Sequence, residues 1–172
     1  MRLQVDSPGP DFRHYAPYYF WFLQGEPQAQ PVIVRNPLDV VFDSHLRLLG
    51  YDLAQPTLNP GETLSVTLYW RATAPVASAA KVFVHLYDAQ GRLGAQVDGW
   101  PVDGTRPPYT WSVGEVIRDR QQVLLPLELP PGRYSLLVGL YDREGRLVAS
   151  SATPQPFSEN RVPLAEIEIR SQ

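Results

Sequence analysis

Apolar and polar residues alternate along residues 63–73 with the period of two that is typical of a β-strand. The apolar positions of this stretch are Leu64, Val66, Leu68 and Trp70. The positions between them are Ser65, Thr67, Tyr69 and Arg71. Because successive side chains of a strand point to opposite sides of a sheet, the pattern predicts an antiparallel strand with one buried face.

Similar runs follow one another along the chain, separated by turns that contain proline or glycine. Residues 81–87 are apolar on both faces, as expected for a central strand. The other predicted strands are residues 46–53, 92–97, 116–127, 133–141 and 163–170. No segment shows a sustained helical period. We therefore expect an all-β fold, a two-sheet antiparallel β-sandwich of immunoglobulin-like or jelly-roll type.

Part of the sequence is repeated. Residues 86–93 read LYDAQGRL and residues 140–147 read LYDREGRL, so six of eight positions agree. Both segments have the Asp and Gly spacing of a tight hairpin turn. Two explanations are open: shared turn chemistry, or two related hairpins that face each other across the sandwich.

The domain organisation predicted from these patterns is an N-terminal aromatic extension and linker, residues 1–36, followed by a β-sandwich domain, residues 37–172. Six of the eight residues 15–22 are aromatic. This stretch is too short to span a bilayer, which takes about 20 apolar residues. It is expected to pack on a sheet, to meet a partner or a membrane interface, or to mediate weak self-association.

Composition narrows the possible functions. The formal net charge is −3 and charged residues are 19% of the chain, which argues against a nucleic-acid partner. The absence of cysteine excludes disulfides and thiolate catalysis. The chain has a single lysine, Lys81, beside 14 arginines, which we attribute to amino-acid usage without a functional prediction.

No catalytic or metal-binding constellation is recognisable. His14, His45 and His85 are scattered, without a pair at ligand spacing, so we expect no metal and no cofactor. His85, in the middle of a predicted strand, is expected to be a hydrogen-bonded core or cleft histidine. Asp119 stands between two arginines, which favours a salt-bridged sheet edge. The chain is therefore not expected to be an enzyme, and a glycoside hydrolase is the weakest alternative.

The region 98–119 concentrates unusual residues in a long connection between two predicted strands. Its aromatic rings could stack on a sugar, while its charged groups bond to hydroxyls. The predicted ligand-binding residues are Trp100, Tyr109, Trp111, Asp98, Asp103, Arg106 and His85. Two other readings are open: the tryptophans close one end of the sandwich, or the loop contacts a protein.

Several motifs resemble, in their order and spacing, one bacterial domain family. They are LRLLGYD at 46–52, PGETL at 60–64, LYW at 68–70, VFVHL at 82–86, WSVGE at 111–115 and LPPGRY at 129–134. The stretch 37–170 is similar to the β-sandwich domain that follows polytopic glycosyltransferases of the dolichyl-phosphate-mannose type in Chloroflexi-like bacteria.

The resemblance implies an extracytoplasmic or cell-envelope accessory module with a membrane protein upstream and a glycan or sugar-lipid ligand. It supplies no catalytic residues. This sequence departs from the family by its aromatic leader and by lacking a transmembrane part. We thus expect a non-catalytic, carbohydrate-binding accessory module, with a structural or protein-interaction domain as the alternative.

Overall fold

The computed structural model describes residues 32–43, 45–152 and 157–171. Residues 1–31 of the predicted extension and linker, with the aromatic stretch 15–22 and His14, therefore lie outside the described residues. Ile33–Gln172 form one compact unit. No helix in the described ranges is long and apolar enough to cross a membrane.

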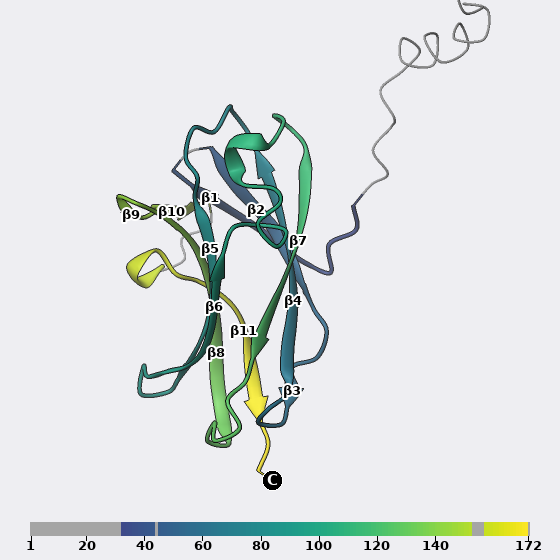
Figure 1. Cartoon of the computed structure of the whole chain (residues 1–172), viewed down its shortest axis with the longest axis vertical. Coiled ribbons are helices and arrows are strands. Elements are labelled where there is room, and N and C mark those ends of the chain that lie inside the picture. The colour runs from purple at the N-terminus through teal and green to yellow at the C-terminus, as the bar shows by residue number, and fades with distance from the viewer. Residues whose placement is uncertain (1–31, 44, 153–156, 172) are drawn as a thin grey trace, which may run out of the picture. The chain divides into compact units, whose positions relative to one another are not determined.

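Two β-sheets pack face to face and confirm the predicted β-sandwich (Figure 1). The first sheet contains, in spatial order, β10 (Ala149–Ser151), β1 (Asn36–Phe42), β2 (Leu46–Leu53), β4 (Thr63–Ala72) and β7 (Val116–Leu124). The second contains β3 (Thr57–Leu58), β11 (Val162–Ile169), β8 (Gly132–Asp142), β5 (Lys81–Asp88) and β6 (Leu93–Gly99), with β9 (Gly145–Arg146) beside β8. Neighbouring strands are antiparallel except β3 and β11, which are parallel.

The core lies between the sheets and follows the alternation read from the sequence. Leu64, Val66, Leu68 and Trp70 on β4 are all fully buried. The indole of Trp70 meets the ring of Phe42 edge-on, with 5.8 Å between the ring centroids. Burial of such large side chains supplies the main driving force for folding.

The two similar hairpins lie in the same sheet, so the interpretation that they face each other across the sandwich is wrong. They share their turn chemistry instead. Asp88 Oδ1 accepts a hydrogen bond from the backbone N–H of Gln90 at 2.9 Å, and Asp142 Oδ1 accepts one from Glu144 at 2.8 Å. In both turns an aspartate caps the backbone two residues further on.

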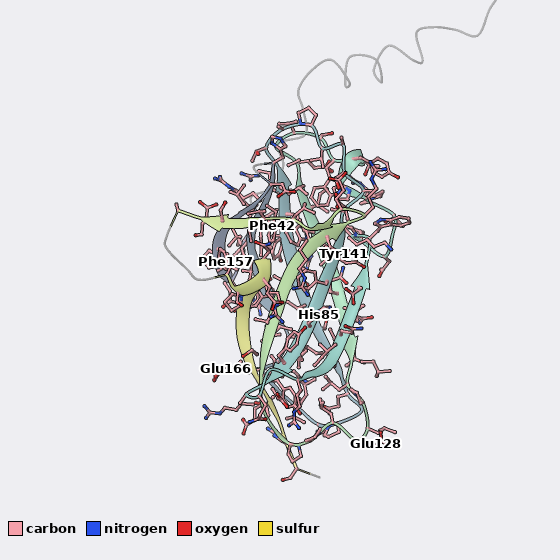
Figure 2. All side chains as sticks on the ribbon, turned by 90° about the vertical axis from the view of Figure 1, so that its left-hand side faces the viewer. Phe42, His85, Glu128, Tyr141, Phe157 and Glu166 are labelled. Atoms are coloured by element: carbon pink, nitrogen blue, oxygen red, sulfur yellow. The ribbon has the colours of Figure 1, made fainter. Side chains whose placement is uncertain are left out.

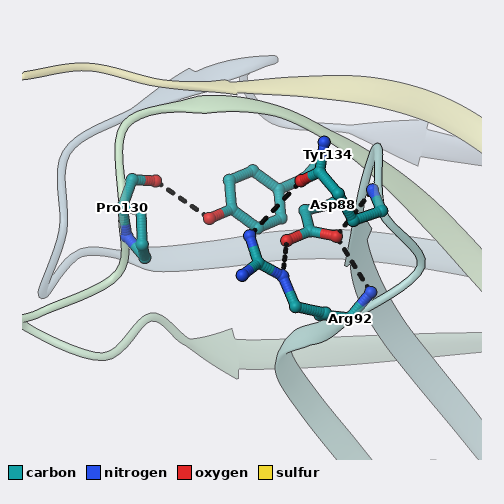
Figure 3. A network of polar contacts seen from close by, with 5 residues as sticks. Asp88, Arg92, Pro130 and Tyr134 are labelled. Carbon is teal, nitrogen blue, oxygen red and sulfur yellow. Dashed lines mark hydrogen bonds and ion pairs between the residues drawn. The ribbon is translucent and has the colours of Figure 1, made fainter.

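The β5–β6 turn lies beside the start of β8 (Figure 3). Asp88 pairs with Arg92 at 2.7 Å, and the hydroxyl of Tyr134 donates to the carbonyl of Pro130 at 2.9 Å. A tyrosine that bonds to backbone a few residues upstream is a recurrent feature of sandwich folds. Each contact orders its own segment at the end of the second sheet that lies away from the long loop.

Gly139 on β8 tests how closely Phe83 packs on the outward side of the second sheet. It pairs with Phe83 on β5, and a Cβ at this position would lie 2.2 Å from Phe83 Cζ and 2.9 Å from the carbonyl oxygen of Asn160. Gly139→Ala is therefore expected to lower the free energy of unfolding by about 1–3 kcal/mol, measured by urea denaturation.

Gly99→Ala is the matched control, because a Cβ on Gly99 would have no heavy atom within 4 Å. We expect a change within about 0.5 kcal/mol for this variant. Equal losses for the two variants would contradict the close packing of Phe83 on Gly139.

Candidate functional site

The outward-facing side chains of β5, β6 and β8 form a continuous surface, here called the outer face. On β5 the side chains of Val82, Val84 and Leu86 enter the core, so those of Lys81, Phe83 and His85 lie on the other side of the sheet. The register places Tyr141 opposite Lys81, and both Gly139 and Asp98 opposite Phe83. Figure 2 views this sheet, with Tyr141 labelled above His85.

His85 and Asp98 are neighbours on the outer face. His85 Nε2 lies 3.3 Å from both carboxylate oxygens of Asp98, and its ring centroid lies 4.7 Å from that of Phe83. The His85 side chain is 10% exposed. Burial lowers the pKa of His85, and the Asp98 carboxylate opposes this shift. His85 is thus a hydrogen-bonded histidine in a mostly covered position.

A cover of two arginines closes the middle of the outer face. The guanidinium of Arg146 lies 5.2 Å from the centre of the Phe83 ring, and that of Arg161 lies 4.7 Å from the centre of the Tyr87 ring. Both pair with Glu159 Oε2 at 2.9 Å. These cation–π contacts and ion pairs shield the aromatic rings from water.

Beyond this cover, the outer face opens into a groove of about 740 Å³. We call it the Trp100 groove. It is lined by Ala77, Ser78, Ala79, Lys81, Trp100, Tyr141, Asp142, Arg143 and Glu144. The Trp100 side chain is oriented from two sides: its indole N–H donates to the carbonyl of Ala79 at 3.2 Å, and Lys81 Nζ lies 5.4 Å from the ring centre. Trp100 nevertheless remains 46% exposed.

Asp142, one of the two acidic residues that line the groove, is also held in place. Asp142 accepts hydrogen bonds from Ser78 Oγ and from the backbone N–H of Glu144, both at 2.8 Å. The backbone and Ser78 donors lower the pKa of Asp142, so its carboxylate is ionised at neutral pH. The groove therefore combines an exposed indole ring, a phenol, an ammonium and a fixed carboxylate.

Tyr141 links the groove to the His85–Asp98 pair. Its ring centroid lies 6.3 Å from that of Phe83, whose ring is adjacent to that of His85. Burial raises the pKa of the Tyr141 phenol, and the charge of Asp98 raises it further. Three predicted site residues, His85, Asp98 and Trp100, thus lie on one surface around Tyr141.

The other predicted residues lie on the loop between β6 and β7, and none of them lines the groove. Trp111 is only 5% exposed and donates its indole N–H to the carbonyl of Arg106 at 2.8 Å. Arg106 in turn pairs with Glu115 at 2.9 Å. Tyr109, in the 3-10 helix η2 (Pro108–Thr110), is 56% exposed, and Asp103 is exposed as well.

Asp119 corrects the prediction of a salt-bridged edge. β7 is an edge strand, but Asp119 is fully buried and its oxygens accept three kinds of donor. They are the indole N–H of Trp70 at 3.3 Å, the backbone N–H of Val102 at 2.8 Å and the side-chain amide of Gln121 at 2.8 Å. Burial raises the pKa of Asp119, although these donors oppose the shift. The carboxylate ties the start of the long loop to the core.

Val102 and Asp103 show why this anchor matters. Both adopt left-handed backbone conformations, with φ of 55° and 51°. Non-glycine residues reach that region only at a cost, and the surrounding contacts must compensate for it. The bond from Val102 to Asp119 is such a contact, and it lies two residues from Trp100.

Sequence reasoning missed Lys81, Tyr141 and Asp142 as site residues. Position parity along β5 places Lys81 on the same face as His85, and that signal was available in the sequence. The pairing of Lys81 with Tyr141 was not, because it depends on which strands are neighbours. Among the described residues, no group of three His, Cys, Asp or Glu side chains could hold a metal ion.

Comparisons with known proteins show the fold and no family. No family model matches this chain, and no curated protein does. The C-terminal domain of wzt is 14% identical, with a TM-score of 0.50, over 77% of this chain and 78% of that one. A Niemann-Pick type C2 protein from Japanese carpenter ant is 7% identical, with a TM-score of 0.48, over 81% of this chain and all of that one.

The alkylpurine DNA glycosylase AlkC of Pseudomonas fluorescens is 16% identical, with a TM-score of 0.46, over 74% of this chain. This chain spans 31% of the length of AlkC. At such identities, the likeness to the wzt domain concerns the β fold alone.

Removal of the Asp119 carboxylate tests its role as an anchor. Asp119→Ala leaves the buried donors of Trp70, Val102 and Gln121 without their acceptor, so we expect a loss of about 3 kcal/mol in the free energy of unfolding. Arg120→Ala, on the exposed side of the same strand, is the control and is expected to stay within about 0.5 kcal/mol. Similar values for both variants in urea denaturation would refute the anchor.

The lowered pKa of His85 predicts a pH-dependent contribution to stability. The folded state binds the proton on His85 less readily than the unfolded chain does, so stability is full above the ordinary pKa of 6.5 and falls as the pH decreases from 6.5 to the lowered pKa. We expect His85→Gln to lose part of the stability difference that the wild type shows between about pH 7.5 and about pH 5.

The control is His45→Gln, because His45 is exposed and directly precedes β2 in the first sheet. Urea denaturation at the two pH values measures both variants. If His85→Gln keeps the whole pH dependence and His45→Gln loses it, the assignment to His85 is wrong.

Proposed function

We propose that this chain is a non-catalytic binding module whose Trp100 groove takes a carbohydrate. The observation that carries the proposal is the half-exposed indole of Trp100, held by Ala79 and Lys81 at the groove beside Tyr141. A large apolar ring costs free energy when left in water, and ligand grooves are a common reason for such exposure.

The chemistry of the groove suits a sugar. A pyranose has an apolar face of C–H groups that stacks on an aromatic ring, and a rim of hydroxyls that bond to polar groups. Trp100 supplies the ring, while Asp142 and Glu144 supply acceptors at the side. Because the indole and Asp142 are already oriented by hydrogen bonds, binding costs little additional ordering.

We also propose a glycan or sugar-lipid of a bacterial envelope as the natural ligand, with a membrane glycosyltransferase as the context. This part rests on the resemblance of the ordered sequence motifs. It makes a polyprenyl-phosphate-linked sugar a useful member of any ligand panel, next to free oligosaccharides.

A variant of Trp100 tests the binding function. We expect at least one saccharide of a panel to shift the indole N–H resonance of Trp100 in an NMR titration. Isothermal titration calorimetry does not depend on the indole signal, and by this measurement Trp100→Ala is expected to weaken binding about tenfold, since aromatic stacking contributes about 0.5–1.5 kcal/mol beyond burial.

Tyr109→Ala is the matched control, because Tyr109 is an exposed aromatic residue of the same loop that does not line the groove. It is expected to bind within about twofold of wild type. Loss of binding in Tyr109→Ala, with Trp100→Ala unchanged, would move the site to η2. No response to any sugar at millimolar concentration would overturn the proposal.

A further inference from the structure

We infer that the ligand of the Trp100 groove is an acidic saccharide, whose negative group binds the ammonium of Lys81. The inference rests on the proposed carbohydrate function and names the class of sugar. The negative group is a carboxylate or a phosphate, which an ammonium binds through the same charge-assisted hydrogen bonds.

Two cationic side chains, Lys81 and Arg143, and two acidic ones, Asp142 and Glu144, line the groove, so its formal charges balance. The Asp142 carboxylate accepts hydrogen bonds from Ser78 and from the backbone of Glu144. Arg143 Nη2 lies 3.8 Å from Glu144 Oε1. Lys81 has no carboxylate oxygen within 4.0 Å among the described residues, and its ammonium lies over the Trp100 ring. Lys81 is therefore the cation of the groove that has no acidic partner in the described part of the chain.

The ammonium of Lys81 lies at the aromatic wall of the groove. Lys81 is half-buried at the start of β5, opposite Tyr141, and its Nζ lies over the Trp100 ring. A cation–π contact uses one side of the ammonium and leaves N–H donors for a ligand. A sugar that stacks on the exposed part of Trp100 would thus bring an acidic substituent next to Nζ.

The experiment compares three sugars that differ only at C6: methyl β-glucoside, methyl β-glucuronide and methyl β-glucoside 6-phosphate. Reductive ¹³C-methylation keeps the charge of Lys81 and gives the only lysine of the chain an NMR signal, which its loss in Lys81→Arg distinguishes from that of the N-terminal amine. An acidic sugar is expected to shift this signal and to bind about tenfold more tightly than the neutral glucoside, since hydrogen bonds to charged groups contribute about 1.5–3 kcal/mol.

Isothermal titration calorimetry of variants then tests whether Lys81 supplies the positive charge that the acidic sugar binds. Lys81→Met is expected to lower the affinity for the acidic sugar about tenfold and to leave the affinity for the glucoside within about twofold. Lys81→Arg retains the positive charge and is expected to keep most of the preference. Arg120→Met is the control, because Arg120 is an exposed cation on β7 that does not line the groove. Circular dichroism of each variant checks that the fold is unchanged.

The outcomes separate the inference from the proposed function. Equal affinity for the glucoside and the acidic sugars overturns the inference and leaves the carbohydrate function in place. An acidic preference that survives Lys81→Met also overturns it. If none of the sugars binds, the proposed function fails and the inference fails with it. Tighter binding of only one acidic sugar supports the inference and identifies its group as carboxylate or phosphate.

Discussion

The strand β5 is apolar on both faces, and most of the second sheet is arranged around this constraint. Its inner face, with Val82, Val84 and Leu86, is covered by the first sheet. Its outer face carries Phe83 and His85, which also have to be kept from water. The chain meets this need with Arg146 and Arg161, which lie on the aromatic rings and share Glu159.

Arg146 and Arg161 lie over Phe83 and Tyr87, and the groove opens beyond them, at Lys81 and Trp100. Trp100 and Lys81 lie beyond the reach of the arginine pair, at the end of the sheet where the loop toward β7 begins. The same loop is fixed at its start by the buried carboxylate of Asp119. Burial of a carboxyl group costs free energy, and the hydrogen bonds from Trp70, Val102 and Gln121 offset that cost while they fix the start of the loop.

Much of the fold could be predicted from the sequence because alternation is a local property. The strands around Leu64 and His85 follow directly from it. Which strands are neighbours depends on contacts between distant residues, so the position of Tyr141 beside Lys81 was not predictable from spacing. For Asp119, the neighbouring arginines suggested an ion pair, whereas the position parity shared with Ile117 pointed to the core. Trp100 and Trp111 could not be distinguished, because only tertiary packing decides which is buried.

The lone lysine has a practical consequence for handling the protein. Amine-reactive reagents, including the esters used for fluorescent labelling and for coupling to biosensor surfaces, have a single lysine to modify in this chain. That lysine lies in the groove, over Trp100. Coupling at this lysine would therefore block the groove, and attachment through an introduced cysteine on the far sheet avoids this because the native chain has no thiol.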